Sequence, residues 1–111
     1  MSNINAAITC VHGVVPEKIL SNKDLEKMVD TNDEWITTRT GIKERRIVAD
    51  GETLSDLGSQ VVKAICDKRG ISPLEMDMII VGTVTEDHRF PSTSNIVCDK
   101  SGATNARGCD L

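Results

Sequence analysis

The sequence predicts an α/β protein in which a layered, mixed sheet carries helices on both faces. Segments rich in β-branched residues alternate along its 111 residues with segments whose apolar residues recur every three or four positions. One segment, Met78–Val84, is a nearly unbroken apolar run, which is typical of a central strand covered on both faces. We therefore expect one domain built from alternating strands and helices.

The chain is expected to begin with a strand and a short helix. β-Branched residues are frequent between Ala7 and Val15, which favours a strand that ends at Pro16. Ser21 and Asp24 have the spacing of a capping box, which predicts that a short helix starts there.

A second helix is predicted to begin at Thr31, since Glu34 follows it at the capping-box spacing. It should end at Gly41, because glycine tolerates the left-handed conformation of helix ends. Residues Lys43–Val48 then form a short, exposed strand or extended segment.

The longest predicted helix spans Leu54–Arg69. A capping box of Thr53 and Asp56 precedes it, its apolar residues recur at helical spacing, and Gly70 follows its end. The apolar strand Met78–Val84 comes next along the chain.

The last elements are a helix capped by Ser92 or Thr93, which ends near Gly102, and a strand at Arg107–Leu111. This strand stops at an apolar residue without a polar tail. We therefore expect the sequence to be the N-terminal portion of a larger protein, with the remainder missing.

Composition argues against several classes of protein. With 13 basic and 17 acidic residues the formal charge is −4, which gives no field that would attract nucleic acid. No apolar run reaches the roughly eighteen residues of a membrane-spanning helix. The first five residues lack the basic and apolar character of a signal peptide, so we expect a cytoplasmic protein.

Metal and cofactor sites are not indicated. The four cysteines are scattered and have neither a Cys-x-x-Cys pair nor a histidine at zinc spacing: Cys10, Cys66, Cys98 and Cys109. We expect buried, reduced thiols rather than disulfides or metal ligands. No glycine-rich loop matches a nucleotide-binding fingerprint, so no tightly bound cofactor is expected.

The most informative spacing is that of Thr31, Trp35 and Arg39, which lie four residues apart and would form one stripe on a helix. An indole offers a face for a nucleobase, and a guanidinium can stack over the base or hold a phosphate. Alternatively, Trp35 belongs to the core and Arg39 pairs with Asp33 or Glu34 at the surface. Spacing alone favours this alternative.

A second candidate region is the loop Glu86–Pro91, because loops at the carboxyl ends of strands carry ligands in open α/β sheets. His88 has the chemistry for proton transfer, but a single loop histidine is more often a surface residue. Phe90 precedes a proline, which favours extended backbone and lets the ring project into a pocket or across an interface.

Several segments carry a family resemblance. Residues 22–45 include Asp-Glu-Trp-Ile at 33–36 and Arg-Thr-Gly-Ile at 39–42; residues 88–92 read His-Arg-Phe-Pro-Ser, and the chain closes with Gly-Cys-Asp-Leu at 108–111. Together they resemble β-ketoacyl-acyl-carrier-protein synthase III over essentially the whole chain. The resemblance implies a thiolase-like layered fold, of which this chain is part of the first α/β half, and a homodimer.

The resemblance also implies a decarboxylating Claisen condensation that begins fatty-acid synthesis. An acyl-CoA, usually acetyl-CoA, acylates a cysteine; malonyl-acyl-carrier protein then loses carbon dioxide and attacks the thioester. Two alternatives remain: a relative that condenses other acyl groups in secondary metabolism, and a non-catalytic coenzyme A-binding or dimerisation module.

The resemblance places Thr31, Trp35 and Arg39 in the coenzyme A site. Trp35 would stack on the adenine, Arg39 would lie on its other side or near the phosphates, and Thr31 would contact the base. For this helix the resemblance therefore reverses the preference for a structural role.

The resemblance implies that Phe90 reaches across the dimer and closes the partner's acyl pocket, which Val84 also lines. Arg89 stands where relatives commonly have a small residue, so the acyl preference stays open. No catalytic residue is expected within the chain, because the nucleophilic cysteine would follow Leu111. Cys109 occupies a strand position rather than a helix start, so it is not the nucleophile, and the 111 residues alone should be inactive.

Overall fold

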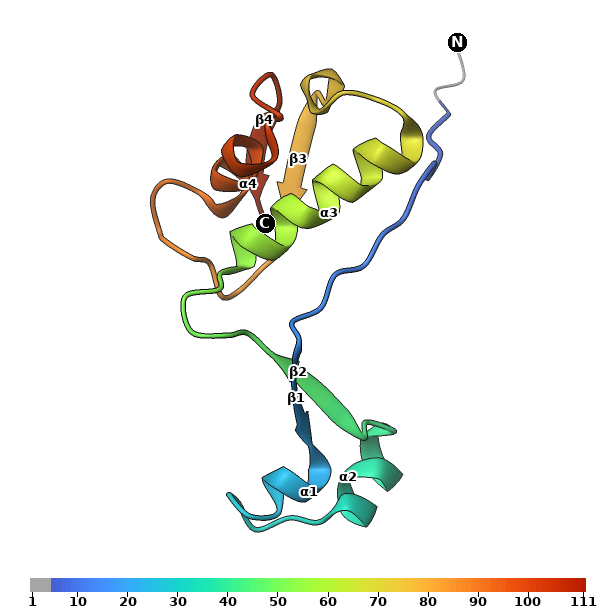
Figure 1. Ribbon diagram of the computed structural model, residues 1–111, viewed down its shortest axis with the longest axis vertical. Coiled ribbons are helices and arrows are strands. Elements are labelled where there is room, and N and C mark those ends of the chain that lie inside the picture. Colours follow the sequence, from blue (N-terminus) through green and yellow to red (C-terminus); the bar gives the residue numbers. More distant parts are fainter. Residues whose placement is uncertain (1–4) are drawn as a thin grey trace. The chain divides into compact units, whose positions relative to one another are not determined.

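A computed structural model describes residues 5–111 of the chain, so the prediction about the first five residues falls almost entirely outside it. The described chain divides into two compact units (Figure 1). One is Val15–Glu52, and the other combines the segment before it with Thr53–Leu111. The predicted α/β class is confirmed, since each unit combines strands with helices.

In the unit Val15–Glu52, the chain forms a strand, two helices and a second strand, and the two strands pair antiparallel. The elements are β1 (Lys18–Ser21), α1 (Asn22–Leu25), α2 (Asp33–Thr40) and β2 (Glu44–Ile47). The capping box of Ser21 and Asp24 is confirmed at the start of α1.

The start of α2 corrects the sequence-based prediction by one residue. Its cap is Asn32, whose Oδ1 accepts a hydrogen bond from the Trp35 N–H at 2.8 Å, so Thr31 lies before the helix. Asparagine caps as well as threonine does, and the spacing alone did not distinguish them. The predicted end is confirmed, because Gly41 has a left-handed φ of 70° and its N–H donates to the Thr37 carbonyl.

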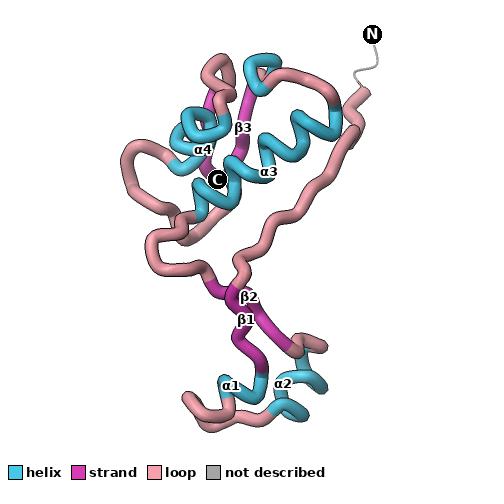
Figure 2. Tube along the Cα trace, in the orientation of Figure 1, coloured by secondary structure: helices cyan, strands magenta, loops and turns pink. Residues whose placement is uncertain are grey.

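The predicted strand between Ala7 and Val15 is wrong. Residues 5–15 form no hydrogen-bonded strand, and β1 begins only at Lys18, after Pro16 (Figure 2). The segment has strand-like residues, but no strand of the described chain pairs with it, and a strand needs such a partner.

The second unit contains α3 (Leu54–Arg69), the short 3₁₀ helix η1 (Pro73–Glu75), β3 (Met78–Val81), α4 (Thr93–Ser101) and β4 (Arg107–Asp110). The predicted bounds of α3 and its capping box are confirmed. β3 and β4 are parallel, and α4 forms the crossover that a parallel pair requires.

One face of this parallel pair is open. Helix α4 packs on both strands and on α3. On β3, however, the side chains of Met78 and Ile80 are 52% and 57% exposed. The expectation of one mixed sheet with a central strand covered on both faces is therefore wrong for the described chain, which forms two separate two-stranded sheets.

Small residues fill the contact between α3 and α4. Cys66, Val97, Cys98 and Ala103 are the buried apolar residues of this unit. A Cβ on Gly58 would lie 2.9 Å from Cγ2 of Val97, so a larger residue fits there only if Val97 or the helices shift. Substitution of Gly58 would force the helices apart or distort Val97.

The four cysteines are free thiols, but only two are buried as expected. Burial raises the pKa of Cys66 and of Cys98, which keeps both protonated near neutral pH. Cys10 is half-buried and Cys109 is exposed. Within residues 5–111, no helix has the length and apolar character needed to cross a bilayer.

A charged clasp connects the start of α3 to α4. The Lys100 ammonium lies 2.7 Å from Oδ1 of Asp56 and 2.7 Å from the hydroxyl of Ser55. Hydrogen bonds from Lys100 and from Thr53 lower the pKa of Asp56 to about 2. Because this pKa lies below the ordinary value of 3.8, the carboxylate stabilises the fold above pH 3.8 and loses that effect as the pH falls towards about 2.

Asp56→Asn should therefore lower the melting temperature of the complete protein at pH 6, and the difference from wild type should shrink as the pH falls below about 4. Thermal melts followed by circular dichroism over this pH range measure the difference. Asp67→Asn, which changes an exposed carboxylate of the same helix, is the control. A difference that is the same at every pH would contradict the clasp.

Candidate functional site

Helix α2 presents an aromatic ring and a guanidinium to solvent. Trp35 is 52% exposed, and the guanidinium carbon of Arg39 lies 4.4 Å from the centroid of its ring, which is a cation–π contact. The two residues line a cavity of about 300 Å³ together with Asn32, Glu34 and Thr38.

This geometry contradicts the structural interpretation of the Trp35 and Arg39 spacing, while the coenzyme A interpretation stays a prediction. Trp35 does not belong to the core, and within residues 5–111 no ion pair joins Arg39 to Asp33 or Glu34. The structural alternative is therefore wrong.

The third member of the predicted stripe does not join it. Thr31 precedes α2, is half-buried and does not line the cavity, whereas Asn32 and Thr38 do. The sequence offered a signal for Asn32, because asparagine is a preferred cap at this position. Thr38 is also exposed and immediately precedes Arg39. It does not fit the four-residue spacing of Trp35 and Arg39, so the sequence gave no signal for it.

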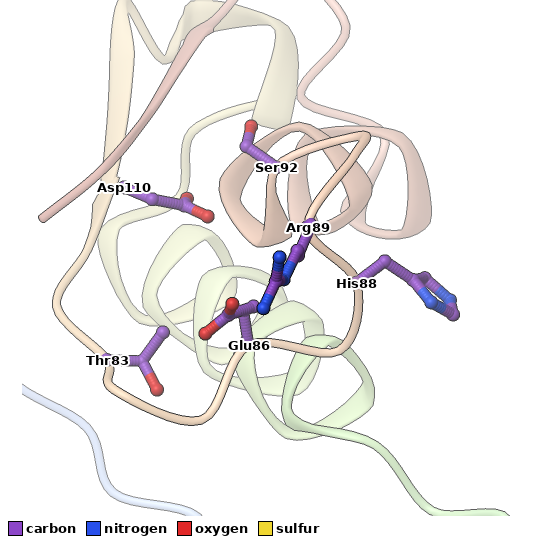
Figure 3. A pocket seen from close by; sticks show the side chains of 6 residues that line it. All are labelled: Thr83, Glu86, His88, Arg89, Ser92 and Asp110. Carbon is purple, nitrogen blue, oxygen red and sulfur yellow. The ribbon is translucent and has the colours of Figure 1, made fainter.

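A second cavity lies beside the loop between β3 and α4. It has a volume of about 440 Å³, and its lining combines both charges with hydroxyl groups: Thr83, Glu86, His88, Arg89, Ser92 and Asp110. Figure 3 shows the imidazole of His88 pointing away from the other five side chains. His88 is also exposed, so it fits a surface role better than proton transfer within this cavity.

Asp110 binds the first turn of α4. Its two carboxylate oxygens accept hydrogen bonds from the N–H groups of Thr93 and Ser94 at 2.7 and 2.8 Å. The hydrogen bond from the Ser94 hydroxyl, with those from the two N–H groups, holds the pKa of Asp110 below its ordinary value. Ser92 occupies the predicted cap position, but its side chain makes no capping hydrogen bond.

Asp87 does the same for α3 from within the loop. Its oxygens accept from the N–H groups of Leu54 and Ser55 at 2.9 and 3.1 Å. Burial raises the pKa of Asp87, but the hydrogen bonds from Ser55 and Leu54 outweigh it, so the pKa lies below its ordinary value. Asp87 thereby fixes one point of the loop that carries Phe90.

The two residues expected at an acyl pocket project into solvent. Phe90 is 90% exposed and Val84 is 96% exposed, and neither lines the loop cavity. Cys109 lies on β4, not at a helix start, as expected. Within residues 5–111, no three histidine, cysteine or acidic side chains come together as a metal site.

Comparison with known proteins shows one consistent similarity. No protein-family model matches the chain. The beta-ketoacyl-acyl-carrier-protein synthase III of Listeria innocua is 51% identical over 108 residues, which are 97% of this chain and 35% of that protein. The chain thus spans about a third of the length of the curated relatives it matches.

Solved structures agree. The crystal structure of 3-oxoacyl-acyl-carrier-protein synthase III from Aquifex aeolicus superposes with a TM-score of 0.82 at 46% identity, over 87% of this chain and 31% of that one. The priming beta-ketosynthase of the R1128 polyketide pathway gives a TM-score of 0.82 at 36% identity, over 88% and 29%.

Asp87→Ala should lower the free energy of unfolding of the complete protein by about 1 kcal/mol, because two N–H groups at the start of α3 lose their acceptor. The neighbouring substitution Glu86→Ala removes an exposed carboxylate and should change stability by less than about 0.5 kcal/mol. Chemical denaturation measures both. Equal effects of the two substitutions would show that Asp87 is not a helix cap of importance.

Proposed function

We propose that α2 binds the coenzyme A part of an acyl-CoA. The proposal starts from the resemblance of this chain to about a third of a β-ketoacyl-acyl-carrier-protein synthase III, which these matches confirm. In the complete protein this acyl-CoA is condensed with malonyl-acyl-carrier protein by a decarboxylating Claisen reaction. The chain supplies residues that bind the nucleotide part of coenzyme A, and the rest of the protein supplies the nucleophile.

The exposed pair of Trp35 and Arg39 is the observation that carries this proposal. A purine stacks on an indole only if a face of the ring is accessible, and Trp35 is half-exposed beside a cavity. Arg39 covers part of one face, so the base either takes the other face or displaces the guanidinium towards the phosphates. Glu34 lines the same cavity and repels phosphate, which favours the Arg39 side for the diphosphate.

Thr31 enters the proposal through the family resemblance alone. It would contact the adenine from just before α2, next to Asn32, which lines the cavity. Asn32 uses its side-chain oxygen as the helix cap, so its amide N–H groups are the ones available to a ligand.

Exposure supports a second role, at a dimer interface. A phenylalanine that is 90% exposed has its ring free to pack against another polypeptide. We propose that Phe90, with Val84, closes the acyl pocket of the partner in a homodimer and limits the length of the primer. Arg89, next to Phe90, would add a charge at the mouth of that pocket.

The level of identity does not separate a primer of fatty-acid synthesis from one of secondary metabolism. The chain is 36% identical to the polyketide priming ketosynthase, which lies between the 51% of the Listeria innocua synthase III and the 30% of another solved 3-oxoacyl-acyl-carrier-protein synthase III. The similar TM-scores show that the backbone does not separate the two functions. Side chains at the pocket must therefore set the primer.

Trp35→Ala in the complete protein should raise the KM for acetyl-CoA by about fivefold to a hundredfold, since loss of one stacked base costs about 1–3 kcal/mol. Steady-state condensation assays with saturating malonyl-acyl-carrier protein measure this. Met28→Ala removes another exposed apolar side chain of the same unit and should leave the KM unchanged. An unchanged KM in Trp35→Ala would refute the proposed site.

Phe90→Ala should shift primer use towards longer acyl chains. We expect the ratio of kcat/KM for hexanoyl-CoA to that for acetyl-CoA to rise by about tenfold, because the shortened side chain leaves room for added methylenes. His88→Ala, in the same loop, is the matched control. If both variants keep the wild-type ratio, Phe90 does not bound the acyl pocket.

A further inference from the structure

Asn22 is a buried polar side chain that contacts α2 at several points. It is 1% exposed and lies where β1 passes into α1. Its amide nitrogen donates to Oδ1 of Asp33 at 2.7 Å, to the carbonyl of Ile42 at 2.8 Å and, more weakly, to the hydroxyl of Thr37 at 3.3 Å. These groups are the first residue of α2, a residue of its middle turn and the backbone just beyond its end.

The other side of Asn22 is held by the strand pair. Its Oδ1 accepts from Nη2 of Arg45 on β2 at 3.0 Å, and Arg45 also reaches the Leu20 carbonyl on β1. The backbone N–H of Asn22 donates to the Lys43 carbonyl at 3.1 Å, which continues the β1–β2 ladder. The side chain therefore connects α2 directly to the strands.

Helix α2 needs such an anchor. It has eight residues, fewer than an isolated helix requires for stability, and Ile36 is its one buried side chain. Apolar burial through Ile36 alone would let the helix rotate about its axis. The hydrogen bonds of Asn22 at both ends of the helix fix that rotation, and with it the direction in which Trp35 and Arg39 point.

The ionisation of Asp33 agrees with this geometry. The hydrogen bond from Asn22, followed by one from Thr37, holds the pKa of Asp33 below its ordinary value, although desolvation acts in the opposite direction. The carboxylate is therefore charged at neutral pH. A charge-assisted bond of this kind is stronger than one between neutral groups.

We propose that Asn22 is a positioning residue for nucleotide binding: it holds α2 in the orientation in which Trp35 and Arg39 grip the coenzyme A part of an acyl-CoA. Asn22 does not line the cavity beside Trp35. The substrate part of this inference rests on the function proposed above, while the orientation of α2 does not.

Asn22→Ala in the complete protein should raise the KM for acetyl-CoA by about tenfold, the equivalent of one hydrogen bond to a charged group, with kcat within about twofold of wild type. Arg46→Met is the control, because the groups that Arg46 binds lie outside α2. It donates hydrogen bonds to the carbonyls of Pro16 and Glu17 and forms an ion pair with the Glu44 carboxylate. This variant should leave both constants unchanged.

A spectroscopic measurement separates the orientation of α2 from substrate binding. With 5-fluorotryptophan incorporated, the fluorine resonance of Trp35 is identified by its loss in Trp35→Phe. Asn22→Ala should shift or broaden that resonance without ligand, because the ring loses its fixed place beside Arg39. Arg46→Met should not change it.

Thr37→Val keeps the experiment decisive if Asn22→Ala does not fold. It removes the weaker contact at 3.3 Å and the Thr37 bond to Asp33, and should raise the KM about twofold with a smaller shift of the same resonance. An unchanged resonance in the folded variants overturns the positioning role. If Asn22→Ala or Thr37→Val shifts the resonance but neither that variant nor Trp35→Ala changes the KM, the nucleotide site is overturned while the anchoring of α2 stands.

Discussion

The folds of both units depend on hydrogen bonds between polar side chains and the ends of helices. Asp87 and Asp110 hold the first turns of α3 and α4, and Asn32 caps α2. The apolar core is thin, because several of the most deeply buried side chains are polar or are cysteines. Hydrogen bonds therefore contribute much of the stabilisation that close-packed apolar residues provide in other domains.

This dependence explains which features the sequence could predict. The bounds of α3 and the capping boxes at Ser21 and Thr53 were predicted correctly, since each depends on residues three positions apart. The caps from Asp87 and Asp110 were not, because their partners are 16 to 33 residues away along the chain. The strand expected at residues 7–15 failed for a related reason, as its residue types favour a strand but no partner strand is present among the described residues.

For the candidate site, four-residue spacing correctly predicted that Trp35 and Arg39 lie together, and it wrongly added Thr31 to the stripe. Trp35 and Arg39 are one turn apart and in contact, as the helical period requires. Thr31 has the same spacing but lies outside the helix, because Asn32 takes the cap. The spacing did not show whether Trp35 is buried or exposed, because exposure depends on tertiary packing that a local pattern does not contain. Asn22 gave no local signal, since its side-chain partners lie 11 to 23 residues further along the chain, in α2, just after it and in β2.

The contact between Arg39 and Trp35 exists before any ligand arrives. A free arginine side chain on a surface samples many rotamers, and fixing it on binding costs up to about 2 kcal/mol of entropy. Here much of that freedom is already removed by the neighbouring ring. For a ligand that stacks on the free face of Trp35 and leaves this contact in place, such preorganisation would leave more of the stacking and ionic interaction energy available as affinity.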